Sequence, residues 1–236
     1  MNIQQRERAR TSSGVPRGFF VTLEGIEGSG KSTHARRLEQ AVRELGFLPY
    51  LTREPGGTPL GDALRSLALG DQEEPPVAEA ELFIILAARA QHVQQVVLPR
   101  LDRGEVVISD RFSDATLAYQ GGGRGLGIDR VQIVGELATS GLMPDLTLLC
   151  DLPVKVALER VHHRRDRGGD YNRFDQEKHE FYEAVRAAYL ELARREPDRI
   201  QIVRSTDPKD EITERLKEIL IPKLLQRAKD GGLSRP

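Results

Sequence analysis

The chain has 236 residues, of which 39% are apolar and 30% charged, with a formal net charge of −1. This composition is typical of a globular protein with a buried core, and it excludes a mainly disordered chain. The near-zero charge gives no general reason to expect nucleic acid as a partner, and no apolar run approaches the roughly 18 residues that span a membrane. Cys150 is the only cysteine, which excludes an intrachain disulfide and favours a reducing, cytoplasmic location.

The first 18 residues, MNIQQRERARTSSGVPRG, are polar and basic and lack the apolar segment of a secretory signal. Their arginines and serines would also suit a transit peptide, but we expect a disordered N-terminal tail. Residues 19–228 are predicted to form one domain, and residues 229–236 a C-terminal tail.

Strand-length apolar runs alternate with helical patterns from Phe19 onward. Apolar residues recur every three or four positions up to a stop at Gly46, and the pattern returns over residues 181–192. Residues 77–101 predict a long, buried helix. The expected strands are FFVTLE (19–24), FLPYLT (47–52), EVVISD (105–110), DLTLLCD (145–151) and RIQIV (199–203). This alternation predicts a three-layer α/β/α domain with a five-stranded parallel sheet.

A phosphate-binding loop follows the first predicted strand. Gly25, Gly30, Lys31 and Ser32 match the pattern G-x-x-x-x-G-K-[ST], between a strand and a helix as its mechanism requires. Glycines let backbone N–H groups approach phosphate oxygens, lysine reaches the β- and γ-phosphates, and serine suits Mg²⁺. The alternative is a glycine-rich turn with a solvated lysine. We expect a P-loop NTPase fold whose nucleotide contacts Gly25, Ile26, Glu27, Gly28, Ser29, Gly30, Lys31, Ser32 and Thr33.

An aspartate–arginine pair ends the predicted strand at residues 105–110. Asp110 lies where the strands of open parallel sheets bind ligands, so it can hold Mg²⁺ together with Ser32. Arg111 suits an anionic substrate. A surface ion pair is the simpler alternative.

An arginine-rich segment, VHHRRDRGGDYNRF, lies between two helical patterns. Such a segment is often only a solvated loop, but beside a P-loop it predicts a short lid, at about residues 162–175, that closes over the nucleotide. Its candidate catalytic arginines are Arg164, Arg165 and Arg167. The histidines lack partners at ligand spacing, and we expect them at solvent-facing positions: His34, His92, His162, His163 and His179.

Together with the lid, the stretches TLEGIEGSGKST, TREPGGTPLG, AARAQHV and SDRFSDATLAYQGGGRG resemble the thymidylate kinase family. The resemblance runs in order from about Phe19 to the C-terminal region. It implies a nucleoside monophosphate kinase that takes dTMP and ATP as substrates with Mg²⁺, and it implies a homodimer.

The resemblance also implies roles for individual residues on the acceptor side. Glu24 would approach the deoxyribose 3′-hydroxyl, Arg53 and Pro55 would lie along the nucleotide, and the Glu54–Pro55 bond is expected to be cis. Arg89 would hydrogen-bond the thymine edge.

Further along the chain, the resemblance implies that Arg111 grips the acceptor phosphate. Thr116 and Gln120 would meet the base or sugar, and Tyr119 would line the pocket. Because the loop from Ile26 to Ser29 contains no arginine, the arrangement matches the bacterial type, in which the lid supplies the catalytic arginine.

Two positions depart from the family pattern. Family members commonly carry an aromatic residue four positions before Arg89, where this chain has Ile85, and Phe83 would point elsewhere. Ala115 stands where a serine is usual. Ile85 can still pack on the base, so the departure does not exclude the function.

The expected reaction transfers the γ-phosphoryl group of MgATP to the dTMP 5′-phosphate, giving dTDP and ADP, with Lys31, Arg111, Glu24 and a lid arginine as catalytic residues. One alternative is a P-loop kinase for another small acceptor, such as dUMP or a nucleoside. The other is a nucleotide-hydrolysing regulatory module. The sequence contains no N-K-x-D pattern of a guanine reader, which counts against that second alternative.

Overall fold

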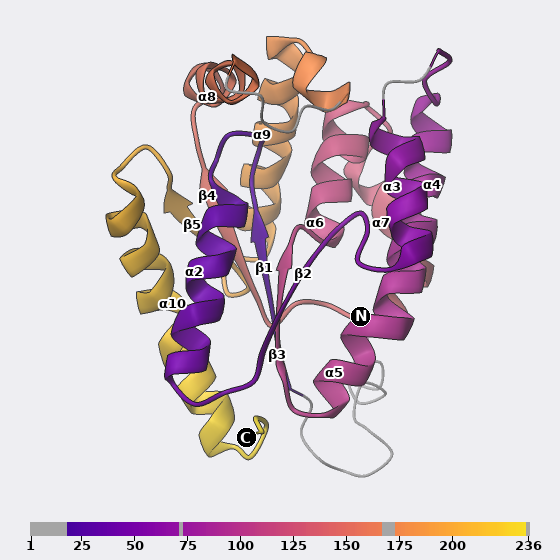
Figure 1. The fold of residues 1–236 in the computed structure, drawn as a ribbon. Coiled ribbons are helices and arrows are strands. Elements are labelled where there is room, and N and C mark those ends of the chain that lie inside the picture. The colour runs from indigo at the N-terminus through magenta and orange to yellow at the C-terminus, as the bar shows by residue number, and fades with distance from the viewer. Residues whose placement is uncertain (1–17, 71–72, 167–172, 235–236) are drawn as a thin grey trace.

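The computed structural model describes residues 18–70, 73–166 and 173–234 and contains a central parallel sheet between helical layers (Figure 1). The strand order is β2-β3-β1-β4-β5, and every neighbouring pair is parallel. The strands are β1 (Phe19–Glu24), β2 (Pro49–Arg53), β3 (Val106–Asp110), β4 (Leu146–Asp151) and β5 (Ile200–Arg204). The predicted five-stranded α/β/α fold is confirmed, and each strand begins within two residues of its expected start.

Helices connect successive strands and cover both faces of the sheet. They are α2 (Lys31–Glu44), α3 (Pro59–Leu69), α4 (Ala78–His92), α5 (Leu98–Asp102), α6 (Ser113–Thr116), α7 (Ile128–Thr139), α8 (Val154–Asp166), α9 (His179–Arg195) and α10 (Lys209–Lys229). Short π-helical segments cover Val93–Val97 and Leu117–Gly123, and a 3₁₀ turn covers Arg173–Gln176.

Alternate residues of β1 face opposite helical layers. Phe19, Val21 and Leu23 pack against α2 and α10, whereas Phe20 packs with residues of the α4–α5 helical run. Because parallel strands are buried on both faces, β1 is apolar over most of its length, and all six of its residues are buried. The carboxyl ends of β1 and β3 lie side by side, with Leu23 paired to Asp110.

The predicted helix over residues 77–101 is present, but it is not regular. A π-helical segment, Val93–Val97, joins α4 to α5. Pro99 follows at the start of α5, and a proline in a regular helix would lack the N–H that bonds four residues back. The local change to π geometry accommodates this missing donor.

The structure describes most of the predicted C-terminal tail but almost none of the predicted N-terminal tail. Residues 1–17 of the predicted N-terminal tail, and Arg167 of the predicted lid, lie outside the described residues. In the predicted C-terminal tail, the Ser234 N–H donates to the Gly104 carbonyl at 2.9 Å.

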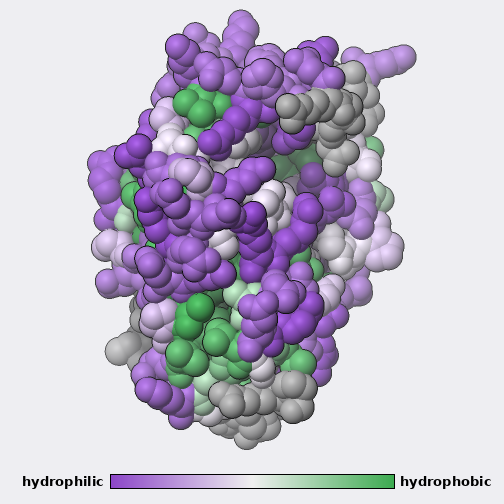
Figure 2. Space-filling model, turned by 60° about the vertical axis from the view of Figure 1, so that its left-hand side comes forward, coloured by the Kyte–Doolittle hydropathy of each residue, from purple (hydrophilic) through white to green (hydrophobic). Residues whose placement is uncertain are grey.

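None of the described helices combines the length and apolarity that crossing a membrane requires. The face shown in Figure 2 is mainly hydrophilic; its broadest apolar area lies in the lower part, and smaller apolar areas lie higher up.

Candidate active site

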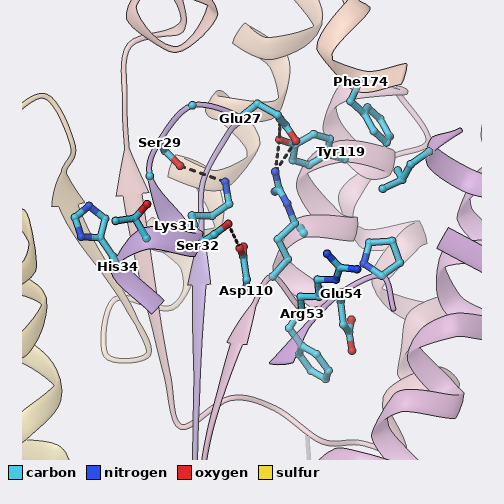
Figure 3. Close-up of a pocket in the computed structure, with 18 of the residues that line it drawn as sticks. Glu27, Ser29, Lys31, Ser32, His34, Arg53, Glu54, Asp110, Tyr119 and Phe174 are labelled. Carbon is cyan, nitrogen blue, oxygen red and sulfur yellow. Dashed lines mark hydrogen bonds and ion pairs between the residues drawn. The ribbon is translucent and has the colours of Figure 1, made fainter. Parts of the chain in front are cut away.

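An open pocket of about 970 Å³ lies at the carboxyl edge of the sheet. Its walls come from the loop after β1, the β2–α3 corner, α4, the segment after β3, and α8 (Figure 3). Seven of the nine predicted nucleotide contacts, residues 27–33, line it, while Gly25 and Ile26 are not part of the lining. The topology therefore places the predicted P-loop beside the predicted acceptor residues.

Two glycines let the P-loop lie close against neighbouring backbone. Gly25 has φ +134°, and a Cβ there would lie 2.4 Å from the Cys150 carbonyl oxygen. Gly28 has φ +76°, and its Cβ would lie 2.6 Å from the Ala157 carbonyl oxygen. A side chain at either position would collide with backbone and would also require an unfavourable conformation, so glycine is required for this path.

Lys31 is folded back into the loop. Its Nζ donates to the Ile26 carbonyl at 2.9 Å and to Ser29 Oγ at 3.2 Å, and the residue is buried. Burial, and then the nearby Arg111 charge, lower the pKa of Lys31. A desolvated cation at the first turn of α2 is well placed to attract a phosphate.

Ser32 and Asp110 meet at the pocket wall. The Ser32 hydroxyl donates to the Asp110 carboxylate, which joins the start of α2 to the end of β3 (Figure 3). Both residues line the pocket. Two hard oxygen donors beside a phosphate-binding loop fit the donor preference of Mg²⁺.

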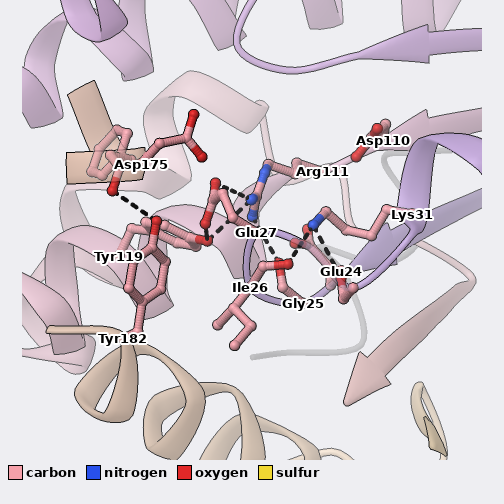
Figure 4. Close-up of polar contacts among 12 residues, drawn as sticks. Glu24, Gly25, Ile26, Glu27, Lys31, Asp110, Arg111, Tyr119, Asp175 and Tyr182 are labelled. Carbon is pink, nitrogen blue, oxygen red and sulfur yellow. Dashed lines mark hydrogen bonds and ion pairs between the residues drawn. The ribbon is translucent and has the colours of Figure 1, made fainter. Parts of the chain in front are cut away.

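Arg111 is the centre of the polar contacts in Figure 4. Its guanidinium donates to Glu27 Oε1 at 2.6 Å, to the Tyr119 hydroxyl at 3.0 Å and to the Tyr189 hydroxyl at 3.2 Å. Its backbone has φ +74°, which is uncommon for a residue other than glycine and turns the chain sharply after β3. Burial alone would lower the pKa of Arg111, but Tyr119 and Glu27 raise it well above its ordinary value.

Glu27 remains ionised although it is buried among these groups. Burial by itself would raise the pKa of Glu27, but the charges of Arg111 and Lys31 and a hydrogen bond from Tyr119 lower it below its ordinary value. The Glu27 carboxylate therefore lies close to both the Arg111 and the Lys31 cations.

Glu24 lies behind the pocket wall. It is fully buried and is not part of the pocket lining; it accepts from the Phe112 N–H at 2.7 Å and from the Tyr189 hydroxyl at 2.8 Å. Burial, and then the Asp114 carboxylate, raise the pKa of Glu24 to about 8. The Glu24 side chain thereby supports the turn that carries Arg111, and its approach to a sugar hydroxyl stays a prediction.

The predicted acceptor residues gather at the other end of the pocket. Arg53 and Pro55 line it from the β2–α3 corner, where the Glu54–Pro55 bond is cis, as expected. Arg89, on α4, donates to Glu54 Oε2 at 2.7 Å and to Thr116 Oγ1 at 2.8 Å. The remaining predicted acceptor residues also line the pocket: Ile85, Arg111, Thr116, Tyr119 and Gln120.

Comparison with known proteins places this site in a family. A sequence model described as Thymidylate kinase matches residues 23–216. The thymidylate kinase of Pseudomonas putida (strain W619) is 48% identical over 211 residues, which are 89% of this chain and 100% of that protein. The chain belongs to the thymidylate kinase family.

Other relatives agree with this family. The thymidylate kinase of Halorhodospira halophila (strain DSM 244 / SL1) is 48% identical over 85% of this chain and 93% of that protein. A crystal structure of thymidylate kinase from Ehrlichia chaffeensis is 29% identical, with a TM-score of 0.68, and the match covers 87% of this chain and 99% of that chain.

The two departures from the thymidylate kinase pattern both lie at the acceptor end. Phe83 is 60% exposed and points away from the pocket, as expected, while Ile85 and Ala115 line it. Phe112 and Phe174 line the same pocket. Aromatic surface is therefore available there, although position 85 does not provide it.

The candidate lid arginines of this kinase are not equivalent. Both Arg164 and Arg165 are exposed, but Arg164 lines the pocket and donates to Asp175 at 2.9 Å, whereas Arg165 is not part of the lining. Arg160, which the sequence analysis missed, lines the pocket one turn earlier and donates to the Gly28 carbonyl at 3.3 Å. Its spacing from Arg164 on a helix was the signal that could have identified it.

Two of the histidines correct the sequence analysis. His34 and His92 were expected to face solvent without partners, but both are buried, 2% and 0% exposed. His34 Nδ1 lies 3.0 Å from Thr213 Oγ1, and His92 contacts Thr52 and Glu54. These partners come from distant segments, so no local pattern could reveal them.

Arg65, on α3, is a further pocket residue that the sequence analysis missed. It donates to the Pro55 carbonyl at 2.8 Å. Burial, and then the Arg53 and Arg111 charges, lower its pKa. Arg53, Arg65 and Arg111 thus line the same pocket, which favours a ligand with several negative charges.

Proposed function

We propose that this chain transfers the γ-phosphoryl group of ATP to the 5′-phosphate of dTMP, giving dTDP and ADP. The bond between the γ-phosphorus and the β,γ-bridging oxygen breaks, a new bond forms from the acceptor phosphate oxygen, and ADP keeps the bridging oxygen with its electron pair. The supporting observation is that one pocket joins Lys31 of the P-loop to Arg111 and Arg89, in a chain of the thymidylate kinase family.

The nucleophile is already an anionic phosphate oxygen, so the reaction needs no general base and no covalent intermediate. The barrier is mainly one of charge and alignment. Lys31 and the backbone N–H groups that begin α2 would neutralise the donor phosphates. Arg111, held on several sides, would orient the acceptor phosphate.

Ser32 and Asp110 would hold Mg²⁺. When bound, the ion neutralises charge on the β- and γ-phosphates. Their mutual hydrogen bond places both oxygens on the same pocket wall. Replacement of Asp110 by Asn should raise the Mg²⁺ concentration required for half-maximal activity, and an unchanged requirement would contradict this assignment.

Arg164 is the lid arginine that we assign to the moving phosphoryl group. Of the candidates within the described residues, it lines the pocket and Arg165 does not. A cation at this position would offset the charge that the phosphoryl group carries between donor and acceptor. Arg160 lies on the same side and would bind the donor phosphates.

The acceptor nucleotide would lie between the β2–α3 corner and α4. Arg89 and Thr116 would meet the base, Arg53 would lie along the nucleotide, and Gln120 and Tyr119 would close the pocket. Pro55 would crowd the sugar. Glu24 would act from behind the wall, by fixing the turn that carries Arg111.

We further propose that the chain works as a homodimer. Exposed apolar side chains gather on three adjoining helices, with α3 packed on α4 and α4 on α7. They are Leu60, Leu67, Phe83, Ile133, Val134 and Leu137. Apolar residues gathered in this way favour a protein partner, and a second copy is the partner that the family resemblance implies.

The cytoplasm is the compartment that we propose for this reaction. Cys150, the single cysteine, is buried on β4 as a free thiol, and burial raises its pKa to about 11. A chain with no possible intrachain disulfide suits a reducing compartment.

The test of the proposed function is ADP release from MgATP with dTMP, dUMP, UMP, dCMP, AMP or no acceptor. Strong preference for dTMP is expected. Preference for another monophosphate would change the substrate and direct attention to Ile85 and Ala115. Equal ADP release with and without an acceptor would contradict the proposal and indicate an ATPase.

A further inference from the structure

The β2–α3 corner, residues 52–57, presents alternate side chains to two different places. Arg53 and Pro55 line the pocket, as does part of the mostly buried Glu54. Thr52 and Glu54 are buried, 9% and 3% exposed, and both contact α4. The alternation follows from the extended backbone at the end of β2, in which successive side chains point in opposite directions.

His92, near the end of α4, fills the inside of this corner. Its Nδ1 lies 2.8 Å from Glu54 Oε1, and its Nε2 lies 2.7 Å from Thr52 Oγ1. Gly57 closes the far side, since a Cβ there would lie 2.7 Å from His92 Cδ2. One imidazole therefore contacts residues before, within and after the turn, and no part of it is exposed.

The hydrogen bond between His92 Nδ1 and Glu54 has a defined direction. Burial alone would raise the pKa of Glu54, but the Arg89 charge and the His92 hydrogen bond lower it, so the Glu54 side chain is a carboxylate that can only accept. His92 Nδ1 must then donate to it. The Thr52 hydroxyl pairs with Nε2 on the other side of the ring, so both ring nitrogens have a partner, and the Glu54 carboxylate also faces the Arg89 guanidinium.

Glu54 connects His92 to Arg89, a residue that lines the pocket. Its second oxygen, Oε2, accepts from Arg89 Nε at 2.7 Å. Arg89 Nη2 in turn donates to Thr116 Oγ1 at 2.8 Å and to the Phe112 carbonyl at 3.0 Å. A carboxylate with one oxygen on His92 and the other on Arg89 cannot rotate without breaking both bonds. The orientation of the Arg89 guanidinium therefore depends on His92.

We propose that His92 is a positioning residue for the acceptor nucleotide. It acts through Glu54 to hold Arg89 in the orientation that reads the acceptor base. The inference rests on the proposed function only in taking Arg89 as an acceptor contact. His92 does not touch the P-loop side of the pocket, so its contribution is confined to acceptor binding.

The test compares two substitutions that place an amide at different ends of the lost imidazole. The amide of His92→Asn lies near the former Nδ1 and can still donate to Glu54. The amide of His92→Gln reaches the former Nε2 position and leaves Glu54 without that donor. The Michaelis constants for acceptor and for ATP, kcat and the thermal midpoint are measured for wild type and for both variants, on the acceptor that the wild type uses best among dTMP, dUMP and dCMP.

His92→Gln should raise the acceptor KM about tenfold or more, the effect of losing a hydrogen bond to a charged group, with a much smaller change in the ATP KM. His92→Asn should stay closer to wild type. Equal acceptor KM values in all three proteins, or an equal rise in both KM values, would overturn the inference. The wild-type acceptor preference tests the proposed function separately, so the two failures are distinguishable.

A second pair of variants keeps the test valid if His92→Gln does not fold. Thr52→Val removes the hydroxyl that holds Nε2 while keeping the side-chain shape, and Thr52→Ser keeps the hydroxyl. The expected result is a raised acceptor KM in Thr52→Val and a smaller rise in Thr52→Ser, with the ATP KM unchanged in both. The reverse order would overturn the inference.

Discussion

Arg111 Nη2 lies 2.6 Å from Glu27 Oε1, so the proposed acceptor-phosphate ligand is already paired with a carboxylate of the P-loop. The two side chains are only 15% and 13% exposed. An arriving phosphate must therefore share Arg111 with Glu27 or displace it. The pair links the acceptor side of the pocket to the donor side.

Arg111→Lys should lower kcat/KM for the acceptor by about 100-fold or more, because an ammonium cannot donate to several partners in a plane as a guanidinium does. The substitution keeps the charge beside Glu27, so the fold should persist. Initial rates of ADP release and a circular dichroism spectrum check both statements. A variant with near wild-type turnover would contradict the role assigned to Arg111.

Lys31→Met should reduce turnover by about two to three orders of magnitude, since it removes the cation proposed for the donor phosphates. The methionine has a similar length and fits the buried path of the lysine stem. Lys217→Met is the matched control and should leave ADP release unchanged, because Lys217 lies on α10, pairs with Glu214 and does not line the pocket. Equal activity in the two variants would argue against a P-loop role.

Arg164→Ala should lower kcat by about 100-fold while changing the KM values little, because the proposed contact forms as the phosphoryl group moves. Arg165→Ala provides the comparison, since the neighbouring arginine does not line the pocket. Single-turnover rates with saturating ATP and dTMP separate chemistry from binding. An effect confined to KM would mean that Arg164 binds nucleotide and takes no part in the transfer step.

The stability of the Glu24→Gln variant relative to wild type should increase as the pH rises. The pKa of Glu24 is raised to about 8 in the folded protein from an ordinary value of 4.5, so between these pH values the folded chain holds a proton that the unfolded chain has lost. Wild-type stability therefore falls as the pH increases across that window, by up to about 1.4 kcal/mol per pH unit from this group. Below about pH 4.5, Glu24 is protonated in both the folded and the unfolded chain, so it no longer makes the stability depend on pH.

Urea unfolding of wild type and Glu24→Gln at several values between pH 5 and pH 8 measures this difference, because glutamine imitates the protonated carboxyl and does not titrate. The stability gap should change in favour of the variant with increasing pH. A gap that is independent of pH would show that Glu24 has the same charge in both states.

Leu137→Glu should convert a homodimer into monomers. Leu137 is 89% exposed on α7 within the proposed apolar interface, and a buried carboxylate there would lack a partner. Ile202→Glu, at a 50% exposed apolar position on β5, is the control and should not change the assembly. Sedimentation velocity distinguishes the outcomes, and a monomeric wild type would contradict the proposed dimer.

The sequence alone determined the framework of this protein, because its signals are local. The glycines of the P-loop, the apolar strand before it and the helix after it lie within about 25 consecutive residues, and their physical requirements can be read without knowing what packs on them. Asp110 and Arg111 could be placed at the sheet edge because parallel strands all end there.

Only the tertiary structure decided how these groups act on one another. It placed Glu24 behind the pocket wall and Glu27 within it, although only two residues separate them in the chain. It also turned His92 from an expected surface residue into a buried link between Thr52 and Glu54. These outcomes depend on contacts between segments that are about 40 to 165 residues apart, and burial and charge pairing at such separations leave no periodic trace in the sequence.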